Sequence, residues 1–203
     1  MIVVGITGNF SSGKSTVTST FKKLGAEVFD ADLVAKNAVR KGTAVYRAIV
    51  QIFGREYLSK SGQIDRRKLA LKVFSSPEDL KKLNILIHPE VILEAMKKIK
   101  ELKNKKGILV LDVPLLYESK MEQLADFVVV VYASAPKMIS RAAKKGVNPA
   151  LSKKILAAQW PLDKKINKAD FVIENKGNLK QLETKAKEIF NRILTGGNTQ
   201  QWK

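Results

Sequence analysis

The run IVVGIT at Ile2–Thr7 is followed directly by GNFSSGKS at Gly8–Ser15. The second segment fits the pattern G-x-x-x-x-G-K-[ST], which binds phosphate when it lies between a strand and a helix. That context is present, because Ile2–Thr7 has the composition of a buried strand and Thr16–Leu24 is compatible with a helix. A Gly-Ser loop that only connects the two elements is the less favoured alternative. The segment therefore predicts a phosphate-binding loop.

Each residue type in this loop has a physical reason. A loop around phosphates must turn consecutive backbone N–H groups inward, and glycine permits both the dihedral angles and the close approach. The helix that follows presents its free N–H groups and the positive end of its dipole to the same anion. We expect Lys14 to contact the β- and γ-phosphates of ATP and the Ser15 hydroxyl to ligate Mg²⁺. The expected nucleotide contacts are Gly8, Ser11, Ser12, Gly13, Lys14, Ser15 and Thr16.

Four further apolar runs extend the pattern. They are apolar at nearly every position, which is typical of parallel strands covered on both faces. Helical stretches separate them, so strands and helices alternate along the chain. The sequence predicts an α/β fold of the P-loop NTPase type, with three α/β/α layers around a five-stranded parallel sheet. The further strands are predicted at Val28–Asp30, Ile108–Val113, Phe127–Val131 and Phe171–Glu174.

Two helical excursions interrupt this core. The gap between Asp30 and Ile108 is too long for one crossover helix, so we expect several helices there, which could form a separate substrate-binding lobe. Ser76 and Pro77 have the N-cap and first-turn chemistry that begins one of these helices. The second excursion, 136–168, carries nine basic residues and one acid, and a helix is predicted over Pro149–Gln159.

The last predicted helix begins near Leu179 and has one apolar face, which we expect to pack on the sheet. The polar tail Gly196–Lys203 is predicted to be mobile. The residues expected on the apolar face are Leu179, Leu182, Ala186, Ile189 and Ile193.

Carboxylates follow the second and third predicted strands, where the ligand crevice of such a sheet lies. Asp32 is the candidate general base for an acceptor hydroxyl, and Asp30 is the weaker candidate. Capping of the next helix is an equally open alternative for both. Asp112 closes the third strand and could hold the Mg²⁺ shell; a solvated loop carboxylate is its alternative.

The composition of the chain is compatible with more than one class of protein. The formal net charge of +18 suits a nucleic-acid binder, an enzyme for polyanionic nucleotides, or a lysine-rich solvated surface. A basic cluster over 97–106 is interpreted as a solvated face. The absence of cysteine excludes disulfides, thiolate metal sites and cysteine nucleophiles. No secretion signal or membrane-spanning run is apparent, so cytoplasmic residence is expected.

These residues, read with their neighbours, resemble the dephospho-coenzyme A kinase family. Single motifs are weak, but their order and spacing over about Gly5–Gly177 are specific. After the phosphate loop, the matching motifs are Asp30-Ala-Asp32, Phe53-Gly54, Gly62-Gln-Ile-Asp65-Arg66 with Leu69, Val73-Phe74, Leu83-Asn84, His88-Pro89, Asp112-Val-Pro114-Leu-Leu-Tyr-Glu118, Arg141, Gln159, Ala169-Asp170 and Asn175-Lys-Gly177.

The resemblance implies ATP-dependent phosphorylation of the ribose 3′-hydroxyl of dephospho-CoA. Asp32 matches the acid that accepts the hydroxyl proton, and Arg141 matches a lid cation that clamps the transferring phosphoryl group. Arg66 and His88 are expected substrate contacts. The alternative for Arg66 is a solvated residue at a helix start; the alternative for His88, which is placed before Pro89 at a helix end, is a structural hydrogen bond. Glu118 could orient the acceptor or cap a helix.

The resemblance also implies one kinase domain over 1–203. The chain departs from the family pattern inside the phosphate loop and in the lid. The loop has Asn9, Phe10 and Ser11 where the family usually has glycines and a small aliphatic residue, and Ser11 stands where glycine dihedrals are favoured. Lys145 stands where a second lid arginine is common. The implied parts are a core of 1–31, 107–136 and 169–195, a CoA-binding lobe at about 32–106 and a lid at about 137–168.

Two alternatives stay open at this point. The first is a kinase for another nucleoside or nucleotide. The second is a basic nucleic-acid-binding ATPase, which is disfavoured because the basic residues of 136–168 are not interleaved with stacking aromatics apart from Trp160. We expect dephospho-CoA as the partner, with no nucleic acid and no membrane, and the sequence leaves monomer and homo-oligomer equally open.

Overall fold

The computed structural model describes residues 1–196, so most of the predicted polar tail lies outside the described residues. The chain divides into two compact units. One contains Met1–Asp30 and the chain from Met96 onward, and the other contains Ala31–Ala95. The helical gap predicted between the second and third strands is therefore largely a unit of its own.

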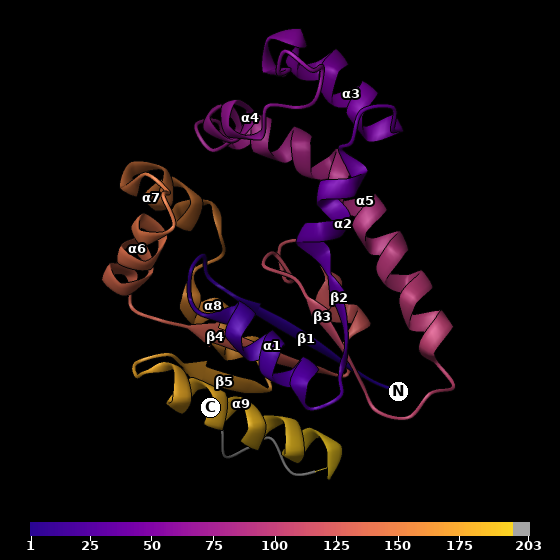
Figure 1. Ribbon diagram of the computed structural model, residues 1–203, viewed down its shortest axis with the longest axis vertical. Helices are drawn as coiled ribbons and strands as arrows, with labels where there is room; N and C mark the ends of the chain where they lie inside the picture. The colour runs from indigo at the N-terminus through magenta and orange to yellow at the C-terminus, as the bar shows by residue number, and fades with distance from the viewer. Residues whose placement is uncertain (197–203) are drawn as a thin grey trace. The chain divides into compact units, whose positions relative to one another are not determined.

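A five-stranded parallel sheet forms the centre of the first unit (Figure 1). The strand order is β2-β3-β1-β4-β5, so β1 lies in the middle and carries the phosphate loop at its carboxyl end. All five predicted strands are confirmed, with ends that move by at most one residue. Their bounds are Ile2–Gly8 for β1, Glu27–Asp30 for β2, Ile108–Asp112 for β3, Phe127–Tyr132 for β4 and Phe171–Glu174 for β5.

Helices α1 (Lys14–Lys23) and α9 (Leu179–Leu194) pack together over one face of this sheet. The rings of Phe21 and Phe190 meet edge to face with centroids 5.2 Å apart. Burial confirms the predicted apolar face of α9 except at its first residue: Leu179 is 62% exposed because it lies in the first turn, and Phe190 is buried instead.

The opposite face of the sheet is closed by the segment after β3. A Cβ atom on Gly5 would lie 2.8 Å from Leu116, so glycine permits this close approach. Met121, which begins the short helix η2 (Met121–Leu124), is also buried. With helices on both faces, the predicted three-layer α/β fold is confirmed.

The sequence ADFV occurs twice, at Ala125–Val128 and Ala169–Val172, with the same hydrogen bonds each time. Asp126 accepts from the backbone N–H of Val3 at 2.8 Å, and its own N–H donates to the Val3 carbonyl. Asp170 does the same with Val128. Each aspartate thus satisfies the backbone at the amino end of the neighbouring strand, which fixes the strand register.

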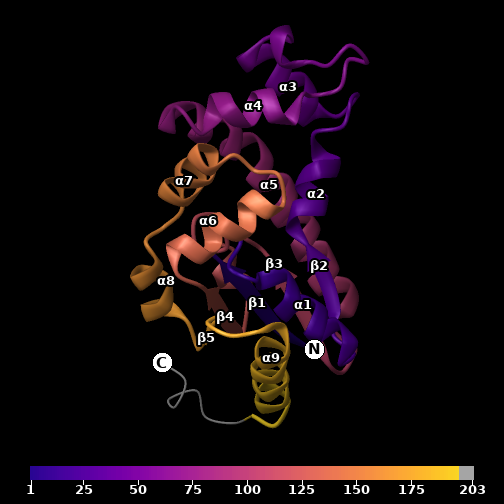
Figure 2. The same cartoon turned by 60° about the vertical axis from the view of Figure 1, so that its left-hand side comes forward.

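The segment between β4 and β5 forms three helices: α6 (Ala135–Lys144), α7 (Pro149–Ala158) and α8 (Leu162–Lys168). We call α6 and α7 the lid helices; they pack side by side in both ribbon views (Figures 1 and 2). The predicted helix over Pro149–Gln159 is confirmed as α7, which ends one residue earlier; Asn148 is its N-cap and accepts from the N–H of Ala150 at 2.7 Å.

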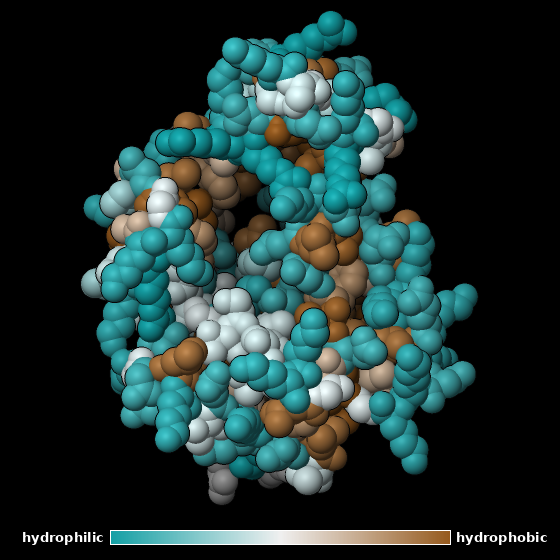
Figure 3. Space-filling model, viewed as in Figure 1, coloured by the Kyte–Doolittle hydropathy of each residue, from teal (hydrophilic) through white to brown (hydrophobic). Residues whose placement is uncertain are grey.

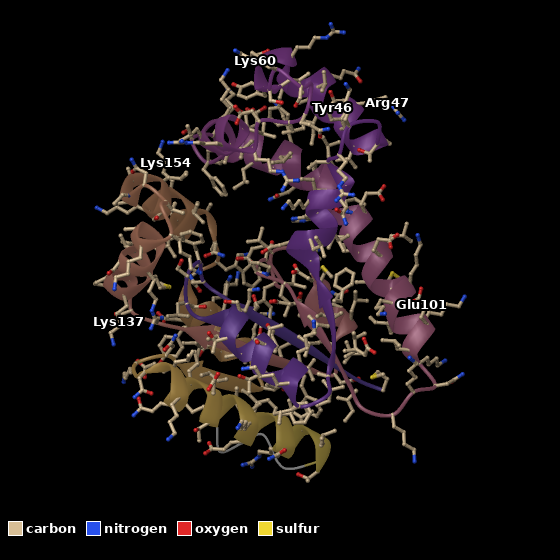
Figure 4. The ribbon with its side chains drawn as sticks, in the orientation of Figure 1. Tyr46, Arg47, Lys60, Glu101, Lys137 and Lys154 are labelled. Atoms are coloured by element: carbon tan, nitrogen blue, oxygen red, sulfur yellow. The ribbon has the colours of Figure 1, made fainter. Side chains whose placement is uncertain are left out.

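The second unit contains α2 (Ala31–Ala38), α3 (Ala44–Phe53), η1 (Arg55–Tyr57), α4 (Arg66–Val73) and the first part of α5 (Pro77–Leu102). It has its own apolar core, in which Ile49 and Val73 are almost fully buried. Tyr46 of α3, labelled in Figure 4, donates its hydroxyl proton to the Gly62 carbonyl at 2.7 Å. This unit can bury its helices without help from the sheet.

Helix α5 confirms one prediction and corrects another. The Ser76 hydroxyl accepts from the N–H of Asp79 at 3.2 Å, so Ser76 is the expected N-cap. His88 and Pro89 were placed at a helix end, and that was wrong, since Pro89 lies inside α5. A proline inside a helix removes one backbone hydrogen bond, which the long helix on both sides tolerates here.

The charged surface follows the sequence interpretation. In the cluster at the end of α5, Lys97, Lys100 and Lys103 are exposed. Glu101, labelled in Figure 4, lies 3.9 Å from Lys98. The face drawn in Figure 3 is mostly hydrophilic, as a solvated, lysine-rich surface requires.

Candidate functional site

The phosphate loop turns sharply between β1 and α1. Ser11 has φ 60° and Gly13 has φ 107°, both in the left-handed region. Glycine adopts that region freely, whereas a serine there is strained by about 1 kcal/mol. A Cβ on Gly8 would lie 2.2 Å from the Val131 carbonyl, so only glycine fits. The loop therefore has glycine where the backbone requires it. Ser11, which departs from the family pattern, lies at a left-handed position that glycine would adopt without strain.

The helix that follows begins without a side-chain cap. Gly13 is the N-cap of α1, and glycine has no side chain that could accept a hydrogen bond from the first turn. The first-turn N–H groups of Lys14 and Ser15 have no carbonyl four residues back within the helix. An uncapped helix start next to a left-handed turn is a ready anion site.

Lys14 and Asp112 meet at the carboxyl edge of the sheet. The Lys14 ammonium forms an ion pair with Asp112 Oδ1, and the two side chains are 14% and 12% exposed. Asp112 is the last residue of β3 and lies in register with Asp30, the last residue of β2. The structure therefore brings together two residues predicted separately, and it excludes the solvated-loop alternative for Asp112.

Asp32 lies two residues along the chain from Asp30, in the first turn of α2. A negative charge in the first turn of a helix complements the helix dipole. The position of Asp32 is therefore compatible both with a role at the start of α2 and with a role as general base. Asp32 lies in the second unit, which begins at Ala31, while Asp30 ends β2 in the first unit.

Arg141 of the lid helix α6 reaches the phosphate loop. Its Nη1 donates to the Ser12 carbonyl at 3.2 Å. The same carbonyl accepts from Asn175 Nδ2 at 2.8 Å. Lys137, labelled in Figure 4, ties α6 to the loop after β5 by donating to the Lys176 carbonyl at 2.7 Å. Of the lid cations, Arg141 is thus the one placed on the loop, whereas Lys145 is exposed at the C-cap of α6.

Gln159 joins the other end of the lid to the same loop. It directly follows α7, and its Oε1 accepts from the N–H of Phe10 at 2.9 Å. Gln159 and Asn175 belong to the family motifs, but no local pattern in the sequence assigns either residue to the phosphate loop. Their motif membership was the only signal.

Glu118 has partners that the sequence did not predict. Its Oε1 accepts from the N–H of Trp160 at 2.8 Å and forms an ion pair with Lys165, also at 2.8 Å. Lys165 is fully buried. The Trp160 ring stacks on Tyr117 with centroids 5.8 Å apart, and the Lys164 ammonium lies over the Trp160 ring, 3.8 Å from its centroid. The segment after the lid is therefore anchored to the turn after β3.

Burial has an electrostatic consequence at this anchor. Loss of solvent raises the pKa of the Tyr117 phenol well above its ordinary value, and the charges of Asp170 and Glu122 raise it further. The Tyr117 phenol is therefore neutral at physiological pH; its hydroxyl has no hydrogen-bond partner among the described residues, and its ring acts as a packing surface for Trp160.

Arg66 and His88 both lie in the helical unit. The Arg66 guanidinium donates to the Lys36 carbonyl at 2.9 Å, which links the start of α4 to α2. His88 is partly buried within α5. Arg66 keeps further donors because a guanidinium has five N–H groups.

The oxygen atoms near Lys14 suit Mg²⁺. This ion prefers carboxylate and hydroxyl oxygens and keeps several waters, so it needs few protein ligands. Asp112 and Ser15 are such donors, at the end of β3 and the start of α1. Within residues 1–196, no cluster of three or more His, Cys, Asp or Glu side chains offers an all-protein metal site. None of the described helices has the length and apolar character needed to cross a bilayer.

Comparison with known proteins gives a consistent result. A family model described as dephospho-CoA kinase matches residues 2–181. The dephospho-CoA kinase of Carboxydothermus hydrogenoformans is 41% identical over 180 residues, covering 87% of each chain. That of Bacillus licheniformis is 40% identical over 192 residues, covering 94% of this chain and 96% of its own.

Solved structures agree. A Thermus thermophilus protein superposes with a TM-score of 0.77 at 33% identity, covering 95% of this chain and 97% of its own. Dephospho-CoA kinase from Campylobacter jejuni gives a TM-score of 0.70 at 24% identity, covering 96% and 98%. Shikimate kinase from Acinetobacter baumannii gives 0.55 at 16% identity, covering 97% and 94%, and these last two show the shared fold alone.

Proposed function

The chain belongs to the dephospho-CoA kinase family, and we infer that it transfers the terminal phosphoryl group of ATP to the ribose 3′-hydroxyl of dephospho-CoA. The products are ADP and CoA, so the reaction is the last step of CoA biosynthesis. One observation carries the site assignment: Lys14 and Asp112 meet beside the uncapped start of α1. That edge of the sheet is where a P-loop kinase binds its triphosphate.

On the nucleotide side, we propose that the phosphates replace Asp112 as the partner of Lys14. The loop N–H groups and the helix start bind the phosphates without rearranging, because α1 begins uncapped. Asp112 and Ser15 would hold Mg²⁺, which neutralises charge on the β- and γ-phosphates when bound. Arg141 lies on the loop already, so its remaining donors are in reach of the transferring group.

On the acceptor side, we propose Asp32 as the group that orients the 3′-hydroxyl and accepts its proton. Arg66 and His88 would contact dephospho-CoA from the helical unit, where a guanidinium suits a phosphate. Glu118 would act through Oε2, a buried oxygen that accepts no hydrogen bond from the described residues. Positioning and charge neutralisation carry most of the catalysis in phosphoryl transfer.

The experiment that tests this function supplies purified protein with ATP, Mg²⁺ and a panel of acceptors. We expect dephospho-CoA to be consumed and a 3′-phosphorylated product to form with one ADP per turnover, identified by mass and by its phosphorus resonance. Phosphorylation of a nucleoside or nucleoside monophosphate, with no turnover of dephospho-CoA, would contradict the proposal. RNA-stimulated hydrolysis of ATP, with no phosphoryl transfer to dephospho-CoA, would contradict it as well.

A further inference from the structure

Asn175 is a buried polar residue to which the proposed reaction assigns no role. It directly follows β5 and is 5% exposed. Its backbone N–H donates to the Tyr132 carbonyl at 2.7 Å, which extends the pairing of β4 with β5. Its side-chain Nδ2 donates to the Ser12 carbonyl at 2.8 Å. A rigid strand end thus holds an amide donor against the phosphate loop.

The orientation of that carbonyl matters for anion binding. A peptide unit that turns its N–H toward an anion turns its carbonyl away from it, because the two groups point in opposite directions across the planar bond. The carbonyl of Ser12 belongs to the peptide whose N–H is that of Gly13, the N-cap of α1. A donor that holds this carbonyl outside the loop therefore keeps the Gly13 N–H directed to the loop interior.

The Asn175 amide packs tightly against Gly13. A Cβ on Gly13 would lie 2.3 Å from Asn175 Nδ2, so a side chain at residue 13 would displace the amide. The same Ser12 carbonyl also accepts from Arg141 at 3.2 Å. One carbonyl thus links the phosphate loop, the end of β5 and the lid arginine.

We propose that Asn175 is a positioning residue that holds the Ser12 carbonyl turned out of the phosphate loop, so that the adjoining N–H groups face the triphosphate. The proposal rests on the proposed function for its ligand. Asn175 acts on the phosphate chain through the loop and makes no contact with the nucleobase.

The test compares two ligands that share only the phosphate chain. Calorimetry measures the affinity of wild type and Asn175→Ala for ATP and for inorganic tripolyphosphate, both with Mg²⁺. We expect both affinities to fall by about tenfold, since loss of the amide leaves a buried carbonyl with one weaker donor. The dephospho-CoA KM is expected to stay unchanged.

Each contrary result has a distinct meaning. A loss confined to ATP would place Asn175 at the base and overturn the proposal, and unchanged affinity for both ligands would overturn it too. Failure of the wild type to bind either ligand would overturn the proposed function itself. The wild-type measurement therefore separates the two failures.

A matched control lies three residues away. Asn178 caps α9 in a capping box with Gln181, where its Oδ1 accepts from the Gln181 N–H at 3.0 Å. Asn178→Ala is expected to lower the unfolding temperature while both affinities stay at the wild-type value. If Asn178→Ala weakened tripolyphosphate as much as Asn175→Ala, a general loosening of this loop would explain the effect and the proposal would fail.

Asn175→Asp adds a rescue that a purely structural role would not show. The carboxylate presents only acceptors to the Ser12 carbonyl, so affinity should fall further than in Asn175→Ala. Arg141, which donates to the same carbonyl, lowers the pKa of a carboxyl at this position, whereas burial and the bound phosphates raise it; we expect the raising effects to prevail, and the protonated form can donate. We expect the affinity relative to wild type to recover as pH is lowered from about 8 to about 5.5, within the range reported for buried carboxyls. A deficit independent of pH would contradict the donor role.

Discussion

Lys14 and Asp112 form an ion pair across 98 residues of sequence, one from the first turn of α1 and the other from the end of β3. Both side chains are mostly buried, so each charge depends on the other for its compensation. A triphosphate offers Lys14 a stronger anion, and Mg²⁺ would offer Asp112 a cation. Under the proposed function, the pair would keep both groups in place until the substrates replace it.

Replacement of Lys14 tests this relationship. Lys14→Ala is expected to lower kcat/KM for dephospho-CoA by about 10²–10³-fold, since one preorganised charge on the transferring group is lost. It also leaves Asp112 without its partner, so the unfolding temperature should fall. The double variant Lys14→Ala/Asp112→Asn removes the unpaired charge and should recover part of that temperature without recovering activity. Steady-state kinetics and thermal unfolding measure both; recovery of activity would contradict the assignment.

The sequence predicted the local parts of this site and missed the long-range ones. The loop, its glycines and the five strands follow from spacing and hydrophobic pattern, which are properties of short segments. The partners of Glu118, in contrast, lie more than 40 residues away at Trp160 and Lys165. Such pairs depend on how parallel strands are ordered in the sheet, and strand order is not encoded in any one segment.

Helix α5 also shows where prediction from a local sequence signal fails. A proline predicts a helix end because it lacks an N–H, but burial of Val91 and Ala95 beyond it stabilises the continued helix. Tertiary packing overrode a local signal there. The helical spacing predicted that Leu179 is buried, but Leu179 is the first residue of α9 and is exposed.

The two aspartates after β2 can be separated by experiment. Asp32→Asn is expected to lower kcat by about 10²–10⁴-fold, the range for loss of a general base, with the ATP affinity unchanged. Asp30→Asn should have a smaller effect on kcat, because Asp30 ends β2 beside Asp112 and precedes the proposed base. Single-turnover kinetics and calorimetry measure the two quantities. If Asp30→Asn removed turnover and Asp32→Asn did not, the base would be Asp30.

The buried pair of Glu118 and Lys165 should dominate the stability of the segment after the lid. Lys165→Met leaves Glu118 without its cation, and breaking a buried pair in this way costs about 3–5 kcal/mol. Glu118→Gln/Lys165→Met removes both charges and should cost clearly less than the sum of the single changes. Denaturant unfolding of the two single variants and the double variant gives the coupling energy. Additive losses would show that the pair contributes no mutual stabilisation.

The pair of Lys72 and Asp79 makes a prediction about pH in the helical unit. The ammonium of Lys72 lies 3.1 Å from Asp79, and its hydrogen bond holds the pKa of that carboxyl below the ordinary 3.8. A lowered pKa in the folded state means that the pair stabilises the fold above pH 3.8 and that this contribution is lost as pH falls through the lower value. Asp79→Asn should therefore unfold at a lower temperature than wild type at pH 7, and the difference should shrink toward about pH 3. Lys72→Met, which removes the cation and keeps the carboxyl, should lose stability over the same pH range. Thermal unfolding of the three proteins from neutral to acid pH is the measurement. If Lys72→Met were as stable as wild type at pH 7 while Asp79→Asn was not, the effect would belong to the helix N-terminus, where Asp79 lies, rather than to the ion pair.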